Sequence, residues 1–144
     1  MSEQQNFATH RRFVPMYHYV LSLLVLAILI GAVINFFKST GGAGLYSASL
    51  ILAIAVSLIF IFLFSRSFAM KAQDRAIRAE ENLRNYVRNG SLLDSRITMR
   101  QMIGLRFASD DEYDDLAARA VSENLSENDI KKSIQNWKAD HERV

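Results

Sequence analysis

Two long uncharged runs dominate the first half of the chain. Residues 19–37 and 45–64 contain no charged side chain, and each run holds 13 Leu, Ile, Val or Phe residues. A run of about 20 such residues is long enough to cross a bilayer as a helix. At roughly −0.3 to −0.6 kcal/mol for each large apolar residue, insertion of each run is favoured by about 4 to 8 kcal/mol. The pattern therefore predicts two membrane-spanning helices.

Two other interpretations fit these runs less well. A pair of buried helices in a soluble protein would need cover on all sides, and the remaining 80 residues, which are rich in charge, are too few to supply it. A cleaved signal peptide agrees with Arg11 and Arg12, but the apolar run is too long and no Ala-x-Ala cleavage site follows it.

The basic residues beside the runs predict their orientation. Arg11 and Arg12 precede the first run, several Lys and Arg residues follow the second, and only Lys38 lies between the two. Positive charge is concentrated on the cytosolic side of membrane proteins, so both termini are expected in the cytosol. The short connection 38–44 contains three glycines, which predicts a tight antiparallel hairpin.

Small residues recur at helical spacing inside both runs. Ala27 and Gly31 are four residues apart in the first run, and Ser49, Ala53 and Ser57 repeat this spacing in the second. Small side chains let the backbones of two membrane helices approach closely. We expect these five positions to be packing sites within the membrane. They pack the hairpin against itself, which we prefer, or against another protein.

The second run is expected to continue into the cytosol as one helix, because no proline or glycine occurs between Leu45 and Asn89. Gly90 then predicts its end. Glu80 and Arg84 are four residues apart in the order that favours an ion pair within a helix. The extension also has one weakly apolar, alanine-rich face that needs a partner: Phe68, Ala72, Ala76, Ala79, Leu83 and Tyr86.

Three capping patterns predict three further short helices. Each pattern combines a Ser or Thr with a Gln, Glu or Asp three positions later: Thr98 and Gln101, Ser109 and Glu112, and Ser126 and Asp129. Apolar residues follow each start at helical spacing, and the last set is Ile130, Ile134 and Trp137. These helices should pack as a thin bundle.

The predicted fold is all-α and has three parts. Residues 1–16 form a cytosolic N-terminal segment, and residues 17–64 form the two-helix transmembrane hairpin. Residues 65–144 form a cytosolic helical module, in which the long helix is followed by three short amphipathic helices.

Charge is divided unevenly within residues 65–144. Residues 66–106 carry nine Lys or Arg and four acids, whereas residues 107–144 carry five and ten. The basic part is expected to lie near the anionic inner leaflet. The acidic part either folds back onto the basic helix or faces a basic partner. The candidate partner surface consists of Asp110, Asp111, Asp114, Asp115 and Trp137.

The chain shows no pattern typical of catalysis or of cofactor binding. It has no cysteine, which excludes thiolate nucleophiles and cysteine metal sites. Residues 110–114 match an Asp-Asp-x-x-Asp magnesium diphosphate pattern, but acids in the first turn of a helix are also what the helix dipole favours. The net charge of +2 is too small to indicate a nucleic-acid partner. We expect no enzyme, no metal, no cofactor and no small-molecule substrate.

Several segments are similar to a known family. They are residues 5–7 (Gln-Asn-Phe), 10–18 (His-Arg-Arg-Phe-Val-Pro-Met-Tyr-His), 93–98 (Leu-Asp-Ser-Arg-Ile-Thr) and 105–110 (Leu-Arg-Phe-Ala-Ser-Asp). With them, the chain resembles over essentially its whole length a family of small bacterial two-span membrane proteins of unknown function. The resemblance implies no activity and no site residues. Some members are labelled transporter permeases, but two spans without an ionisable residue at depth argue against transport by this chain alone.

We therefore expect a non-enzymatic scaffold or accessory subunit in the bacterial inner (cytoplasmic) membrane. It would be a multi-pass protein with both termini cytosolic, in contact with the lipid bilayer, and its helices would bind a protein partner or a second copy. The alternative is an auxiliary subunit of a membrane transporter that packs through its transmembrane helices. Leucine at Ser49, Ala53 and Ser57 would remove the partner only in the alternative.

Overall fold

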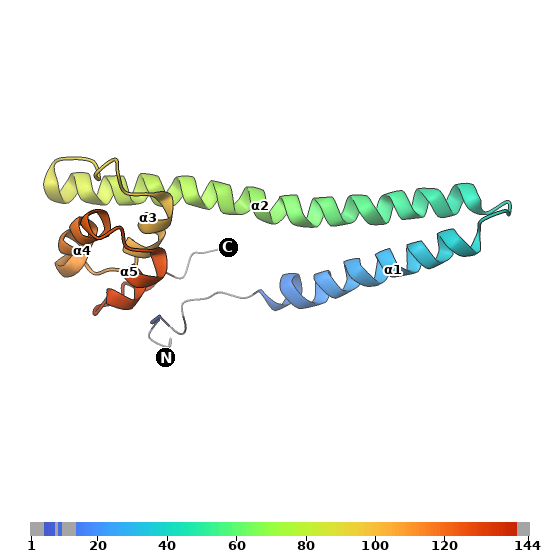
Figure 1. Cartoon of the computed structure of the whole chain (residues 1–144), viewed down its shortest axis with the longest axis horizontal. Helices are drawn as coiled ribbons and strands as arrows, with labels where there is room; N and C mark the ends of the chain where they lie inside the picture. The colour runs from blue at the N-terminus through green and yellow to red at the C-terminus, as the bar shows by residue number, and fades with distance from the viewer. Residues whose placement is uncertain (1–4, 8, 10–13, 141–144) are drawn as a thin grey trace. The chain divides into compact units, whose positions relative to one another are not determined.

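The computed structural model describes residues 5–7, 9 and 14–140, and these residues are helical throughout apart from turns and short loops. In this part of the chain the only β-pairing is an isolated antiparallel bridge between Ala108 and Trp137. The expected all-α fold is confirmed. The elements are a π-helical turn at Met16–Leu21, then α1 (Ser22–Lys38), α2 (Leu45–Asn89), α3 (Met99–Leu105), α4 (Asp110–Ser122) and α5 (Glu127–Ser133) (Figure 1).

The chain is divided into two compact units. The apolar unit is Phe13–Ala69, and the helical unit is Met1–Arg12 together with Met70–Val144. α2 contributes residues to both units, because nothing in its sequence interrupts the helix. The single helix predicted over this range is confirmed. Gly90 ends it with φ at +70°, a left-handed conformation that favours glycine.

In the apolar unit, α1 lies beside the first part of α2 and runs in the opposite direction (Figure 1). The Tyr17 hydroxyl donates a hydrogen bond of 2.8 Å to the Phe62 carbonyl oxygen, and the two rings stack with their centres 4.7 Å apart. The turn between the helices has Gly41 at φ +89°. A side chain would strain this conformation, which explains the glycine.

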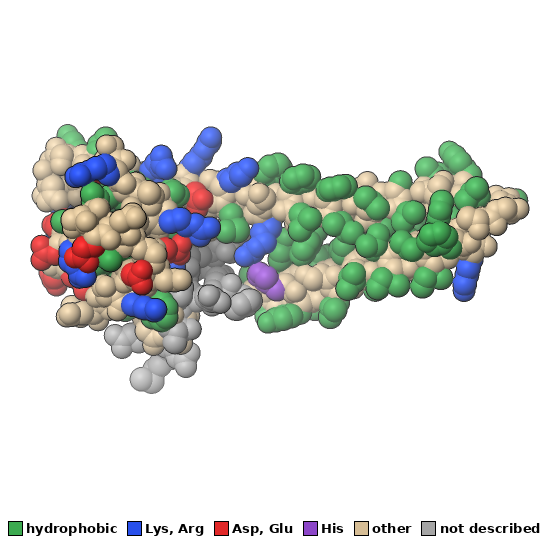
Figure 2. Space-filling view, in the orientation of Figure 1, with side chains coloured by type: hydrophobic (Ala, Val, Ile, Leu, Met, Phe, Trp, Pro, Cys, Tyr) green, Lys and Arg blue, Asp and Glu red, His purple; other side chains and the backbone are tan. Residues whose placement is uncertain are grey.

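Both helices of the apolar unit are long and apolar enough to cross a membrane, by length and composition. Only 11% of the most apolar stretch of each is buried. Figure 2 shows hydrophobic side chains over the visible face of this unit. The small side chains buried there are Ala32, Ala48 and Ala55. A core helix of a soluble protein would instead be mostly buried.

The helical unit has a hydrophobic core of its own. α3, α4 and α5 pack on one another and on Ile77 of α2. Gly104 allows α3 and α5 to approach closely, because a Cβ atom at this position would lie 3.0 Å from the Ile130 side chain. The largest side chains that are fully buried are Leu105, Phe107, Tyr113 and Ile130.

Gln5 belongs to the helical unit. Its side-chain amide donates to the carbonyl oxygen of Asp140 at 3.2 Å and accepts from the Asp140 N–H at 2.7 Å. Gln5 of the predicted N-terminal segment 1–16 thus contacts Asp140, which lies far away in the sequence. Arg11 and Arg12, on which the predicted orientation partly rests, lie outside the described residues.

Two of the three predicted helix caps are confirmed. The Thr98 hydroxyl accepts from the Gln101 N–H at 3.3 Å, and the Gln101 side-chain oxygen accepts from the Thr98 N–H at 2.9 Å. The Ser126 hydroxyl accepts from the Asp129 N–H at 3.2 Å and donates to its carboxylate at 2.6 Å. α3 and α5 begin directly after these caps, as the pattern predicts.

The capping box predicted at Ser109 is wrong, although α4 does begin there. The Ser109 hydroxyl is buried without a hydrogen bond. Glu112 accepts instead from the N–H groups of Gln135 and Asn136, at 3.0 Å each, and the Ser109 N–H donates to the Asn136 carbonyl oxygen. The chain after α5 thus returns to the start of α4. Its N–H groups bind the Glu112 carboxylate, which the capping box would need.

The prediction that Trp137 continues the last helix is also wrong. α5 ends at Ser133, and Ile134 is already extended, with φ −69° and ψ 123°. Trp137 pairs with Ala108 in the antiparallel bridge, and its ring centre lies 5.1 Å from that of Phe107. Backbone pairing with the chain before α4 replaces a further helical turn.

We expect Thr98→Ala and Ser126→Ala each to destabilise the helical unit by about 1 kcal/mol, because each removes a formed N-cap. Ser109→Ala is the matched control, with an expected change below about 0.5 kcal/mol, since the hydroxyl that it removes has no hydrogen bond to lose. Amide hydrogen exchange of the full-length chain in detergent measures all three. An equal loss for Ser109→Ala would contradict these cap assignments.

Candidate interaction site in the helical unit

Arg84 is the centre of the polar contacts between α2 and the start of α4. Its guanidinium donates to the Asp110 carboxylate at 2.5 and 2.8 Å and to the Ala108 carbonyl oxygen at 2.8 Å. It lies 3.4 Å from the Glu81 carboxylate and 4.0 Å from the centre of the Tyr113 ring. Only 10% of the Arg84 side chain is exposed. Charge-assisted hydrogen bonds of this kind hold a side chain in one orientation.

The helical period of α2 explains the position of Arg84. Ile77, Glu81 and Arg84 are spaced by four and three residues, so they share the face of α2 that packs against the other helices. The prediction that Arg84 pairs with Glu80 is wrong. Its guanidinium donates to Asp110 instead. Asp110 is distant in the sequence and lies near Arg84 only because the helices pack together.

A second set of contacts joins the end of α2 to α4. Arg88 donates to one oxygen of the Asp114 carboxylate at 2.8 Å, and Asn89 donates to the other at 3.0 Å. The start of the acidic part therefore folds back onto the basic helix, which is one of the two arrangements that the charge pattern left open.

These cations lower the pKa of both carboxyl groups. The pKa of Asp110 is lowered mainly by its hydrogen bond from Arg84, and that of Asp114 mainly by its hydrogen bond from Arg88. A carboxyl group whose pKa is lowered on folding stabilises the fold fully above the ordinary aspartate pKa. This contribution is lost as the pH falls through the lowered value. The attachment of α4 to α2 is thus complete at neutral pH.

The five residues predicted to form a partner surface have different surroundings in the structure. Asp110 and Asp114 contact α2, whereas Asp111 and Asp115 are exposed on α4. Trp137 is half-buried against the core. All four aspartates are exposed, but Asp110 and Asp114 already pair with cations of α2, so Asp111 and Asp115 are the better candidates for contact with another molecule.

The five small residues predicted to pack within the membrane are mostly exposed in the apolar unit. Ala27, Gly31, Ala53 and Ser57 are exposed, and Ser49 is half-buried. A Cβ atom added at Gly31 would meet nothing within 4 Å. The small side chains that are buried in this unit are instead the three alanines described above. The five positions remain predictions for contact with another protein.

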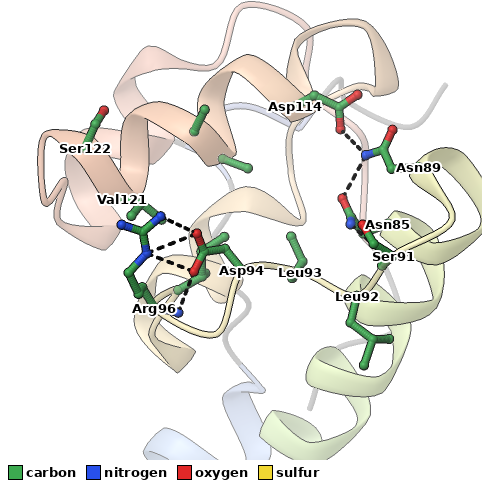
Figure 3. A pocket seen from close by; sticks show the side chains of 13 residues that line it. Asn85, Asn89, Ser91, Leu92, Leu93, Asp94, Arg96, Asp114, Val121 and Ser122 are labelled. Carbon is green, nitrogen blue, oxygen red and sulfur yellow. Dashed lines mark hydrogen bonds and ion pairs between the residues drawn. The ribbon is translucent and has the colours of Figure 1, made fainter.

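A pocket of about 500 Å³ lies between the end of α2, the loop that follows it and α4 (Figure 3). Asn89 lies at one end and donates to Asn85 and Asp114, both at 3.0 Å. Arg96 and Asp94 form an ion pair of 2.6 Å at the other, and the hydrogen bonds from Arg96 lower the pKa of Asp94 to about 2. Asn85 and Asn89 could not be recognised as site residues from the sequence, because uncharged amides four positions apart fit no motif.

The groups in the pocket suit recognition by hydrogen bonding. Amides, backbone carbonyls and an ion pair bind polar groups of a peptide or a small molecule. Nearby Tyr113 is fully buried, and desolvation followed by the negative charge of Glu81 raises its pKa, so its phenol keeps its proton. Among the residues that the structure describes, no three His, Asp or Glu lie close enough together to hold a metal ion.

Comparison with known families covers the whole chain. The model of DUF6526, a family of unknown function, matches residues 1–144. The chain belongs to DUF6526. Membership of a family of unknown function, which the resemblance implied, is thus confirmed, and it assigns neither an activity nor a site residue to the DUF6526 chain. No curated protein and no solved structure matches this chain.

Proposed function

We propose that this DUF6526 chain is a membrane-anchored scaffold or accessory subunit. The apolar unit crosses the bacterial inner membrane twice, and the helical unit binds a protein partner in the cytosol. One observation carries the proposal: the most apolar stretches of two helices are only 11% buried, and the apolar unit shares no residue with the hydrophobic core of the helical unit. Exposing two apolar helices of this length costs free energy in water but not in lipid.

The distribution of basic residues supports cytosolic termini. Lys38 is the only charged residue in the connection between the two apolar helices, whereas Arg66, Lys71, Arg75 and Arg78 follow the second. All four are exposed. In this orientation they would face the anionic leaflet, where each adds about 1 kcal/mol to membrane attachment.

Labelling of single cysteines tests this topology, because the chain has no native cysteine. Thr40 and Ser122 are both exposed, and we expect Thr40→Cys to react with an impermeant maleimide in spheroplasts. Ser122→Cys should react only after the membrane is opened. The opposite pattern would show that the orientation is inverted, and a protein recovered in the soluble fraction would show that the apolar unit does not span the membrane.

A second candidate function is that of an auxiliary transporter subunit. It is favoured by the exposure of Ala27, Gly31, Ala53 and Ser57 on the apolar unit, since small residues permit close contact with the spans of another protein.

Two variants distinguish the two functions through the amount of partner that co-purifies in mild detergent. If the helical unit binds the partner, Asp111→Lys with Asp115→Lys should reduce recovery, and more at low salt than at high salt. Leucine at Ala53 and Ser57 should then have no effect. The reverse result would favour the transporter subunit. Asp110 and Asp114 are left unchanged, because they hold α4 on α2.

A further inference from the structure

α2 has an exposed apolar face within the helical unit. Leu83, Tyr86 and Val87 are 62%, 56% and 76% exposed. Buried Ile77 and Glu81 lie on the opposite side of the helix, where the other helices pack. Large exposed apolar side chains that cluster on one face mark an interaction surface. Three exposed alanines continue the face at helical spacing: Ala72, Ala76 and Ala79.

We propose that this face of α2 pairs with the same face of a second copy of the chain as a parallel two-stranded coiled coil. Its residues alternate by four and three positions, which is the 3.5-residue repeat of coiled-coil core positions. Ala76 and Leu83 occupy the first core position of successive heptads, and Ala72, Ala79 and Tyr86 occupy the second. The alanines allow the two helices to approach closely.

Charge beside the core supports a second copy in parallel orientation. Arg75 directly precedes one core residue and Glu80 directly follows the next, so they occupy the two flanking positions that form ion pairs between coiled-coil helices. In a parallel pair, Arg75 of each copy faces Glu80 of the other. An antiparallel pair would instead bring flanking positions of the same kind together and place like charges side by side.

Arg75 and Glu80 are available for this pairing. Both are exposed, and within the described part of the chain no ion pair involves either. They are five residues apart, so they do not face each other on their own helix. Arg84, the cation that the sequence offers to Glu80, is held by Asp110 and Glu81 instead. The fold thus leaves one cation and one anion beside the apolar face.

Membrane insertion strengthens the case for a parallel pair, and this step rests on the proposed function. Two copies inserted with the same topology have their α2 helices pointing in the same direction. Confinement to one membrane also raises the effective concentration of each copy for the other, so that a core with three alanines is sufficient.

Crosslinking of the full-length chain in native membranes tests the pairing. Single variants Ala76→Cys and Leu83→Cys, treated with a short bis-maleimide, should each give about tenfold more covalent dimer than Lys71→Cys, which is exposed outside the core positions. An antiparallel pair would link at most one of the two core positions to itself. Dimer yields at the level of Lys71→Cys for both core variants would overturn the proposal, and so would binding of a different protein to this face in place of the second copy.

Exchanging the charges of Arg75 and Glu80 tests the pairing independently, without an introduced cysteine. Arg75→Glu should lower the association constant about tenfold, because two attractive pairs become repulsive, and Arg75→Glu with Glu80→Arg should restore it to within about twofold. Failure of the double variant to restore dimer would overturn the proposal. Correct topology without core crosslinks would reject the dimer alone, whereas core crosslinks with a soluble or inverted protein would reject the proposed membrane topology alone.

Discussion

Arg84→Ala is expected to destabilise the helical unit by about 3 kcal/mol, because it leaves the Glu81 carboxylate buried without its cation. Glu81 is only 5% exposed. The substitution also removes the hydrogen bond to the Ala108 carbonyl oxygen and the cation above the Tyr113 ring. Unfolding of the full-length chain by denaturant in detergent, followed by the fluorescence of its single tryptophan at the core, measures the effect.

Two further variants separate burial of charge from loss of an ion pair. Arg88→Ala should cost less than about 1 kcal/mol, since Arg88 is 28% exposed and its partner Asp114 is 46% exposed. Adding Glu81→Gln to Arg84→Ala should recover part of the lost stability, because no unpaired charge then remains inside. Equal losses for Arg84→Ala and Arg88→Ala would show that Glu81 is not stabilised by Arg84.

The parts of the fold that local signals determine could be predicted from the sequence. Uncharged runs predicted the two long apolar helices, because their length and composition are sufficient on their own. The starts of α3 and α5 follow from Thr98 and Ser126, whose caps involve residues only three positions away. The end of α2 follows from Gly90, whose N–H bonds to the Tyr86 carbonyl oxygen in a left-handed turn.

The wrong predictions concern residues that contact segments far away in the sequence. Glu112 stands at the capping-box position, but residues 135 and 136 offer it two N–H groups that no local pattern reveals. Trp137 keeps the spacing of a helix with Ile130, yet the seven-residue α5 ends before it, and Lys138 donates to the Phe107 carbonyl oxygen instead. A short helix gains little from one more turn, so tertiary backbone pairing decides its end.

The candidate site shows the same division. The acidic start of α4 was visible in the sequence, and so was a choice between folding back on α2 and facing a partner. The sequence did not show which carboxylates contact α2. Asp110 and Asp111 are neighbours in the chain, and only the packing of the helices distinguishes them. Most of the exposed apolar face of α2 could be predicted, since a surface helix face depends on spacing alone, but Val87 was not among the predicted residues.

Phe107→Ala is expected to destabilise the helical unit by about 3 to 5 kcal/mol, the range for removing a fully buried aromatic side chain. Phe107 is 0% exposed. Its ring lies 5.1 Å from that of Trp137 and within 5.4 Å of the cationic groups of Arg106 and Lys131. Truncation would leave a cavity in the core beside Trp137. It would also remove the cation–π contacts that the Phe107 ring makes with Arg106 and Lys131.

Leu92→Ala is the matched control, because Leu92 is 65% exposed, and we expect a change within about 0.5 kcal/mol. Hydrogen exchange of the full-length Phe107→Ala chain should show lost protection in α3, α4 and α5, while α1 and α2 up to Ala69 stay protected, since the apolar unit shares none of this core. Loss of protection that spreads equally over α1 would contradict the division into two units with separate cores, and with it the structural basis for an anchor that carries an independent helical unit.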